Sequence, residues 1–405
     1  MKKSLFYRNA ICCCLILLLS AGMFTGCAQK EGESLQNGGN PSQEAAGEKT
    51  DADTRTVVDV IGREVEIKKE IKHTVITAAG HGGAFMTMCA LLGEDVVDYI
   101  AGWDNRLKTD NLDMYENFIK YLPELDSIAD VGSIFRESFN VEKLIEINPD
   151  ICIFSAEEKE AVEATIASKL NKAGIPYVYV EYVDETTENQ EKSTRLLGEI
   201  FNKTDRAEEL VDYCIGKRNE IENRVKDIVE ERGSRPKVYF ECAALGVDEY
   251  GYTYSNTTQW GLMTDKAGGN NISEGKVSKY GNIDLEYLLR EDPEYIIFSG
   301  AYWVKAPTSL RMGYKATEAE TQQQLKEFMS RKGWDQLQAV KNNQVYAIYH
   351  SLGCEMFDFV SLEFIAKAIY PDEFKDIEPL EDLYEYFDQF MPFDLEGVWM
   401  TRVEQ

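Results

Sequence analysis

The amino-acid sequence predicts an α/β protein whose body consists of two similar halves, each with a mostly parallel sheet, joined by one long helix. Short apolar strands alternate with amphipathic helical segments in both halves, which is typical of parallel sheets. Residues 205–232 keep apolar side chains on one face, which predicts a helix of about 40 Å. The segments 140–156 and 284–300 align without gaps and share Glu, Leu, Pro, Ile, Phe and Ser at matching positions, which indicates an internal repeat.

The first 55 residues precede this body. Residues 1–27 combine a basic start with a short apolar run and end at Cys27 in the sequence FTGC. The run is shorter than the about 20 apolar residues that span a bilayer, so it is typical of an export signal. The small residues before Cys27 resemble the lipobox of bacterial lipoproteins, although Phe24 replaces the usual Leu. The alternative is a plain cleaved signal peptide. The polar residues 28–55 predict a flexible tether.

The first half, residues 56–204, is expected to begin with a β-hairpin. Residues 56–60 and 63–67 alternate in polarity on both sides of a tight turn at Gly62, a pattern typical of two paired strands. The strands expected after the hairpin lie at 74–78, 96–101, 151–155 and 177–181. The expected helices lie at 84–92, 114–121, 157–173 and 187–201.

The long helix at 205–232 connects the first half to the second half, residues 233–395. Asp205 is suited to cap its start, and Gly233 with the nearby Pro236 ends it. The second half repeats the alternation, with strands expected at 238–242, 295–299 and 345–349, and helices at 260–267, 285–289, 320–329 and 357–368. In both repeated segments a short helix is ended by a Pro and followed by a buried strand.

Composition excludes several classes of function. The chain carries 71 acidic and 43 basic residues, which gives a net charge of −28. Such a surface repels nucleic-acid phosphates and anionic lipids, whereas it does not repel a cation or a ferric complex. The cysteines that follow Cys27 are widely spaced and lack a CxxC pair, so neither a disulfide framework nor a zinc knuckle is expected. A polytopic membrane protein is also excluded. The classes that agree with the composition are a soluble enzyme and a binding protein.

Several motifs together resemble one family. The sequences VVDVIGREVEI, VEKLIEINPDICIF, LEYLLREDPEYIIF, AGGNNIS and LEFIAKAIYPDEF, spread over about residues 56–390, resemble the helical-backbone substrate-binding proteins that serve ABC importers of ferric siderophores, haem and cobalamin. The resemblance implies two Rossmann-like lobes joined by a long helix, a monomer with no cofactor of its own, and an ABC permease with its ATPase as partners. It also implies that Glu142 and Glu286 dock on permease arginines. The alternative is that both carboxylates only complement a helix dipole.

Candidate ligand-binding residues follow the predicted strands, where loops of α/β sheets form binding sites. His81, in the sequence GHGG, and His350 each come directly after a strand. We therefore expect them in one cleft between the lobes, where both are candidate ligands of iron. The alternative is that each is a hydrogen-bonded loop histidine. Aromatic and cationic residues at other strand ends suit a planar or anionic chelate. The candidate set is His81, Trp103, Arg106, Tyr254, Tyr302, Trp303, Arg311 and His350.

The sequence therefore predicts a lipoprotein at the outer face of the cell membrane that captures a ferric complex, either a siderophore or haem, and delivers it to an ABC permease. A cobalamin or other corrinoid receptor is the alternative within the family. A secreted α/β hydrolase and a sensor without a transporter are the alternatives from other classes. The GHGG sequence resembles an esterase oxyanion-hole loop, but the chain has no GxSxG, GxxxxGK[ST] or HExxH motif, so no catalytic residues are expected.

Overall fold

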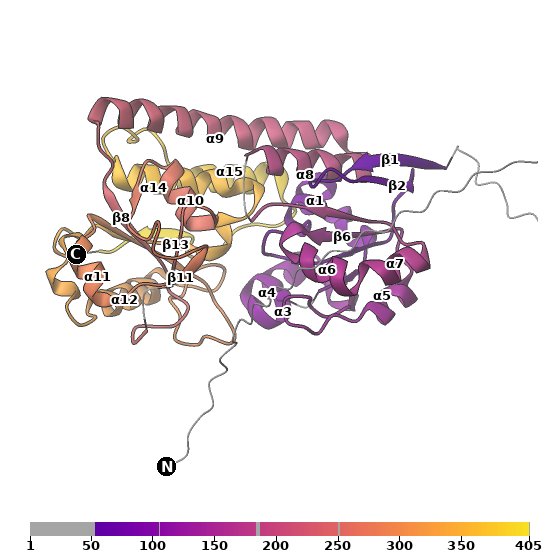
Figure 1. Cartoon of the computed structure of the whole chain (residues 1–405), viewed down its shortest axis with the longest axis horizontal. Helices are drawn as coiled ribbons and strands as arrows, with labels where there is room; N and C mark the ends of the chain where they lie inside the picture. Colours follow the sequence, from indigo (N-terminus) through magenta and orange to yellow (C-terminus); the bar gives the residue numbers. More distant parts are fainter. Residues whose placement is uncertain (1–52, 105, 184–186, 250–251, 405) are drawn as a thin grey trace, which may run out of the picture. The chain divides into compact units, whose positions relative to one another are not determined.

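The structure is a computed structural model that describes residues 53–104, 106–183, 187–249 and 252–404. The expected export signal, Cys27 and nearly all of the expected tether lie outside the described residues. Among the residues that the structure does describe, no helix has the length and apolar character needed to cross a bilayer. The described residues form two α/β lobes and a long helix (Figure 1).

The first lobe opens with an antiparallel hairpin and contains a parallel sheet of five strands in the order β5-β4-β3-β6-β7. The hairpin strands are β1 (Thr54–Val58) and β2 (Glu64–Lys68). The sheet strands are β3 (Thr74–Ile76), β4 (Ile100–Trp103), β5 (Ala129–Asp130), β6 (Ile151–Ser155) and β7 (Tyr177–Val180). The helices are α1 (Phe85–Leu92), α2 (Val96–Tyr99), α3 (Arg106–Asp110), α4 (Leu112–Tyr121), α5 (Val141–Ile147), α6 (Lys159–Thr165), α7 (Ala167–Ala173) and α8 (Thr187–Ile200).

The second lobe contains a sheet in the order β10-β8-β12-β13-β14, parallel except for β14. Its strands are β8 (Lys237–Cys242), β10 (Asn270–Asn271), β12 (Tyr295–Gly300), β13 (Val345–Tyr349) and β14 (Met400–Arg402). A separate antiparallel pair consists of β9 (Tyr252–Tyr254) and β11 (Tyr280–Asn282). The helices are α10 (Gln259–Lys266), α11 (Leu285–Glu291), α12 (Glu318–Met329), α13 (Gln338–Lys341), α14 (Phe359–Ile369) and α15 (Pro379–Phe390).

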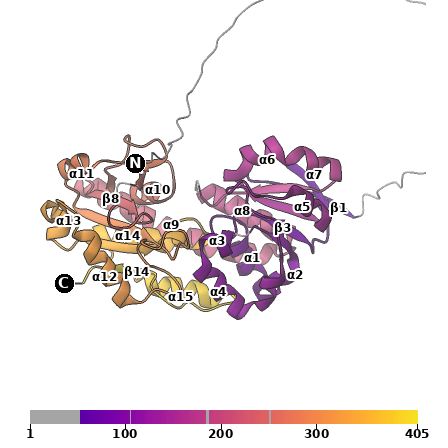
Figure 2. The same cartoon turned by 90° about the horizontal axis from the view of Figure 1, so that it is seen from below.

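Helix α9 (Thr204–Arg232) connects the lobes and packs on α8 of the first lobe and α14 of the second. In Figure 1 it runs along one side of both lobes, and Figure 2, seen from below, shows the two lobes side by side in front of it. Its apolar face is buried, and it ends at Gly233, whose φ of 65° is the left-handed conformation that glycine adopts readily. The predicted fold, two α/β lobes joined by one long helix, is confirmed.

The internal repeat is visible in the structure. Asn140 and Asp284 cap α5 and α11 in the same way, each side chain accepting a hydrogen bond from the backbone N–H three residues later. Both helices end in a residue with left-handed backbone, and both lead into an inner strand of their lobe's sheet, β6 or β12. Glu142 and Glu286 lie at the same position in the first turns of these helices and are exposed.

Three expectations about elements were wrong. Residues 96–99, expected as a strand, form α2, because the buried Val96 and Ile100 are four residues apart, as on a helix face. The helix expected at 157–173 is divided at Ile166 into α6 and α7. The second lobe continues beyond residue 395, since β14 pairs with the edge of its sheet.

Candidate ligand-binding site

A cavity of about 430 Å³ lies between the lobes at the carboxyl ends of their strands. The first lobe contributes His81, Arg106, Asp110, Phe135, Arg136 and Glu157. The second lobe contributes Cys242, Ala244, Leu245, Tyr252, Tyr254, Thr258, Gln259, Tyr280, Trp303, Lys305, Ala306 and His350. Of the eight residues in the predicted set, the structure brings five together in this wall: His81, Arg106, Tyr254, Trp303 and His350.

The loop that carries His81 is held tightly. Gly80 and Gly82 have φ of 77° and 70°, and a Cβ on Gly82 would lie 2.1 Å from Cγ2 of Val183, so both positions favour glycine for steric reasons. The buried carboxylate of Asp104 accepts hydrogen bonds from the backbone N–H groups of Ala78 (2.9 Å) and Ala79 (3.2 Å). The GHGG sequence is therefore explained by backbone geometry and close packing.

His81 and His350 face each other across the lobes. Their rings are parallel within 3°, with centroids 5.8 Å apart. Nδ1 of His350 lies 2.9 Å from Oγ of Ser299, and the Trp303 ring lies edge-on to His350 at 5.2 Å. Burial lowers the pKa of His350 to about 4, and burial together with the nearby Arg106 lowers the pKa of His81 well below its usual range. Both rings are neutral at pH 7 and keep a lone pair.

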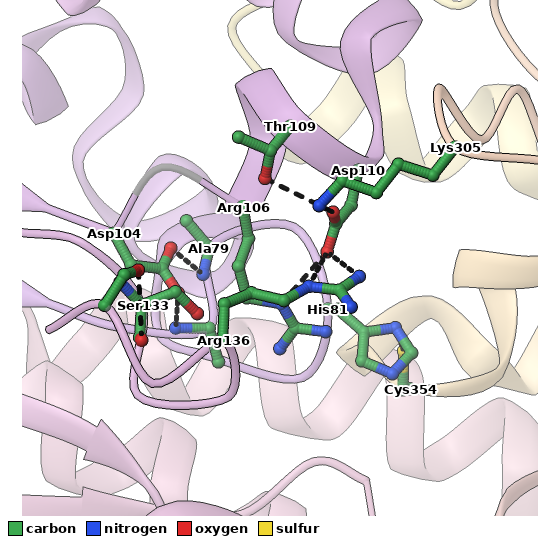
Figure 3. A network of polar contacts seen from close by, with 12 residues as sticks. Ala79, His81, Asp104, Arg106, Thr109, Asp110, Ser133, Arg136, Lys305 and Cys354 are labelled. Atoms are coloured by element: carbon green, nitrogen blue, oxygen red, sulfur yellow. Dashed lines mark hydrogen bonds and ion pairs between the residues drawn. The ribbon is translucent and has the colours of Figure 1, made fainter. Parts of the chain in front are cut away.

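Cationic side chains gather at the first-lobe wall (Figure 3). The carboxylate of Asp110 lies 2.8 Å from Nη2 of Arg136, 4.0 Å from Nε of Arg106, and 3.7 Å from Nζ of Lys305, which comes from the second lobe. One carboxylate among three cations leaves an excess of positive charge. The other acidic residue in the wall is Glu157.

Glu157 does not remove this excess, because its carboxylate pairs with Lys279 of the second lobe at 3.6 Å. The wall is therefore positive in a chain whose net charge is −28. A positive cavity inside an acidic protein attracts an anion selectively, because field lines are focused in a concave, partly buried site. The arrangement suits a ligand with carboxylate or phenolate oxygens.

Apolar and aromatic side chains line the rest of the cavity. Six large hydrophobic side chains are strongly exposed in the part of the chain that the structure describes, and three of them are in this wall: Phe135 at 63%, Tyr280 at 53% and Leu245 at 45%. The guanidinium groups of Arg106 and Arg136 lie 4.9 Å and 5.2 Å from the Phe135 ring centroid. Exposed apolar surface rimmed by charges marks a binding site. The cavity can therefore bind a ligand that is both anionic and apolar.

Three residues of the predicted set lie outside the cavity wall. Trp103 points into the core of the first lobe, where it packs against Phe85 and Tyr115. The Arg311 guanidinium lies 4.0 Å from the ring centroid of Tyr302 and donates a hydrogen bond to the backbone oxygen of Pro307. Arg311 and Tyr302 thus hold their own loop together. Tyr302 and Arg311 do follow β12, whereas Trp103 is the last residue of β4, and position along the chain does not determine the direction of a side chain.

Sequence reasoning missed several residues of the wall, among them Asp110, Phe135, Arg136, Gln259 and Tyr280. Phe135 and Arg136 follow β5, which is only two residues long and has no apolar run to reveal it. The adjacent Phe and Arg in a Gly- and Ser-containing loop were the available signal. Asp110 can be identified only from the three-dimensional structure, because its partner Lys305 belongs to the other lobe and is distant in the sequence.

Two lobes, one connecting helix and a cavity at the strand ends define an extracytoplasmic solute-binding fold. Residues 90–351 match the family model described as periplasmic binding protein, and the chain belongs to that family. A solved structure, the TroA-like periplasmic binding protein FepB from Veillonella parvula, is 36% identical with a TM-score of 0.83, and the match covers 86% of this chain and 99% of that one. The chain is therefore a substrate-binding protein of an ABC importer and not an enzyme, as the sequence predicted.

Two curated relatives are more distant in sequence. The molybdate-binding protein MolA of Haemophilus influenzae is 21% identical over 359 residues, which cover 83% of this chain and 90% of MolA. The high-affinity heme uptake system protein IsdE of Staphylococcus aureus is 26% identical over 207 residues, which cover 51% of this chain and 62% of IsdE. The names of these relatives refer to different cargoes. The comparisons therefore support the class of protein, and the cargo has to be inferred from the chemistry of the cavity.

Proposed function

We propose that this protein captures an anionic ferric complex, a siderophore or haem, in the cavity between its lobes and delivers it to an ABC permease. The observation that carries the proposal is the excess of positive charge formed by Arg106, Arg136 and Lys305 around Asp110, next to aromatic side chains, in a strongly acidic protein. Arginine pairs with carboxylate and catecholate oxygens, and aromatic rings supply area for the organic part of a chelate.

The same observation disfavours two other cargoes. A molybdate ion is a small tetraoxyanion with no apolar surface, so it gains nothing from Phe135, Tyr280 and Leu245 or from a cavity of about 430 Å³. Cobalamin is large and carries little net charge, so a positive wall contributes little to its binding. A ferric chelate uses both the cations and the rings. In this proposal His81 and His350 are available to an iron atom that has open coordination positions, as in haem.

The first test is a set of binding titrations followed by intrinsic tryptophan fluorescence, because Trp303 is in the cavity wall. The probes are haemin, a ferric triscatecholate siderophore, a ferric hydroxamate siderophore, cobalamin and molybdate. We expect saturable binding of at least one ferric complex, and tighter binding of it than of cobalamin or molybdate. A preference for molybdate or cobalamin contradicts the proposal. With haemin, His81→Ala or His350→Ala is expected to change the absorption spectrum if that histidine ligates iron.

The second test removes charge from the wall. Arg106→Gln together with Arg136→Gln is expected to weaken binding of the ferric complex about tenfold or more, because hydrogen bonds to charged groups contribute about 1.5–3 kcal/mol each. The control is Lys226→Gln, which removes a charge from the exposed side of α9. If the double variant binds as tightly as the control, the cationic cluster is not part of the site.

A further inference from the structure

We infer that Cys354 and Glu355, which belong to the second lobe, are positioning residues for His81 of the first lobe. Through them, the orientation of a side chain in the ligand cavity depends on the contact between the lobes. The inference rests on the proposed function, because it takes this cavity as the ligand site. It concerns groups behind the cavity wall, which do not themselves touch the ligand.

The first contact fixes the backbone beside His81. Glu355 is 1% exposed, and its Oε1 accepts a hydrogen bond from the backbone N–H of Gly82 at 3.1 Å. This bond crosses from one lobe to the other. A Cβ on Gly82 would lie 3.7 Å from the backbone oxygen of Cys354, so the loop and this segment are in close packing. A buried carboxyl oxygen that accepts a backbone N–H holds that backbone in one conformation.

The second contact favours a hydrogen on Nδ1 of His81. Sγ of Cys354 lies 3.5 Å from Nδ1 of His81 and 3.7 Å from the backbone oxygen of Ser351. The thiol hydrogen is directed to the backbone oxygen of Ser351, which only accepts, and in that arrangement Nδ1–H of His81 donates to the sulfur. Figure 3 shows the Cys354 side chain beside the His81 ring.

With Nδ1 protonated, Nε2 of the neutral His81 ring carries the lone pair. The amide nitrogen of Gln259, a residue of the cavity wall, lies 3.4 Å from Nε2 and can donate to it. The three contacts therefore form one consistent chain, from Gln259 through His81 and Cys354 to Ser351. The result is a preset lone pair on the cavity side, which a hydrogen-bond donor or an iron atom of the ligand would take over from Gln259.

The test uses the free protein first. The chain has only three histidines, so the imidazole ¹⁵N signals are few, and His81→Gln assigns the signal of interest. At pH 7.5 we expect wild-type His81 to carry its hydrogen on Nδ1. Cys354→Ala and Glu355→Ala are expected to alter the tautomer or the ring shifts. Glu355→Gln is expected to restore the wild-type signal, since an amide oxygen still accepts from Gly82.

The matched control is Glu363→Ala, which removes another buried glutamate, on α14. It is expected to leave the His81 signals unchanged, because no contact joins Glu363 to the loop among the hydrogen bonds of the described residues. If Glu355→Ala does not fold, Cys354→Ala, which removes only the sulfur, decides the question. His81 signals in Cys354→Ala identical to those of the wild type overturn the inference.

The second readout is affinity for haemin and for the ferric triscatecholate. Groups that orient a ligating histidine change metal affinity by about 10–100-fold, so we expect Cys354→Ala and Glu355→Ala to weaken haemin binding about tenfold and Glu355→Gln to bind haemin nearly as the wild type. The ferric triscatecholate, whose iron has no open position for a histidine, is expected to lose less affinity. Unchanged affinity in both alanine variants overturns the link to binding. If the wild type binds none of the ferric probes, the ferric hydroxamate included, the proposed function fails, whereas the NMR result still decides whether these residues position His81.

Discussion

Glu363 is a carboxyl group that the fold keeps neutral. It lies on α14, buried beside Asp382 and Lys217, and burial followed by the charge of Asp382 raises its pKa to about 9. Lys217 is already paired with Asp382 at 2.6 Å. The protonated Glu363 is therefore suited to donate a hydrogen bond to Asp382, while an ionised Glu363 would place a second negative charge in the same buried region.

This group makes stability depend on pH. In the unfolded chain Glu363 ionises near 4.5, but in the folded chain it holds its proton to about pH 9. Between these two pH values the folded state binds more protons than the unfolded state. The contribution of Glu363 to folding stability is therefore full below pH 4.5 and is lost as the pH rises toward 9. We expect Glu363→Gln to raise the free energy of unfolding on the order of 2–4 kcal/mol at pH 7.5, and to change it little at pH 4.5. Urea unfolding at both pH values measures the difference, and an equal effect at both contradicts the assignment.

Single residues also mark the limit of prediction from sequence. His81, Arg106, Trp303 and His350 were found because they follow strands, and chain order alone brings such loops to one edge of a sheet. Trp103, expected just after a strand, is the last residue of β4 and packs into the core. Side chains of a strand point alternately to the two faces of the sheet. Which of these faces is buried depends on the helices that pack on the sheet, and the strand's own sequence does not specify it.

At the scale of elements, the repeated helix–strand units were predicted most accurately. The expected strands at 151–155 and 345–349 agree with β6 and β13 at every residue, because a continuous buried apolar run leaves no alternative. Short elements such as α2 and β5 were missed or mistaken, since two to four residues hold too little periodicity. The repeat was visible in the sequence because both units keep Glu, Leu and Pro in the helix and at its end, and Ile, Phe and Ser in the strand.

The matching N-terminal caps of α5 and α11 give Glu142 and Glu286 equivalent positions on the two lobes. Lys169 lies 2.8 Å from Glu142 and lowers its pKa, but an exposed ion pair contributes little free energy and is easily exchanged for a permease arginine. We expect Glu142→Arg with Glu286→Arg to abolish transport in whole cells while ligand affinity stays unchanged, because both carboxylates are outside the cavity wall.

The control for this experiment has the same change of charge. Glu160 and Glu381 also lie exposed in the first turns of helices, one in each lobe, but outside the repeat. Glu160→Arg with Glu381→Arg is expected to leave transport near the wild-type rate. Transport by the Glu142 and Glu286 variant at that same rate would remove the docking role from both residues.

At the scale of the whole molecule, the sequence predicts attachment through Cys27, which lies outside the described residues. An ABC importer needs its binding protein close to the permease, and a lipid on Cys27 followed by a polar tether would provide this. We expect Cys27→Ala to release the protein into the soluble fraction of a cell lysate or the culture medium. A Cys13→Ala variant, changed within the apolar run, is the control and is expected to remain with the membranes.

The connection between the lobes leads to a last prediction, on how far they move. Asp358 of the second lobe accepts a hydrogen bond from Gln190 of α8 at 2.8 Å and forms a buried ion pair with Arg218 of α9. One carboxylate thus joins the second lobe to the connecting helix and to the first lobe. Because both partners are buried and the helix is continuous, large rotations of the lobes would break costly contacts.

We therefore expect the bound ligand to change the radius of gyration of the wild type by less than about 1 Å in small-angle X-ray scattering. Asp358→Ala leaves the charge of Arg218 buried without this partner, which costs about 3–5 kcal/mol and is expected to lower the melting temperature and to loosen the lobes. Asp382→Ala, which removes a half-buried partner of Lys217 on α15 and touches no contact of the first lobe, is the control and is expected to leave the scattering profile unchanged. A wild-type contraction of several ångströms on binding would show that the lobes close by a wide hinge, in spite of the helix and the buried pair.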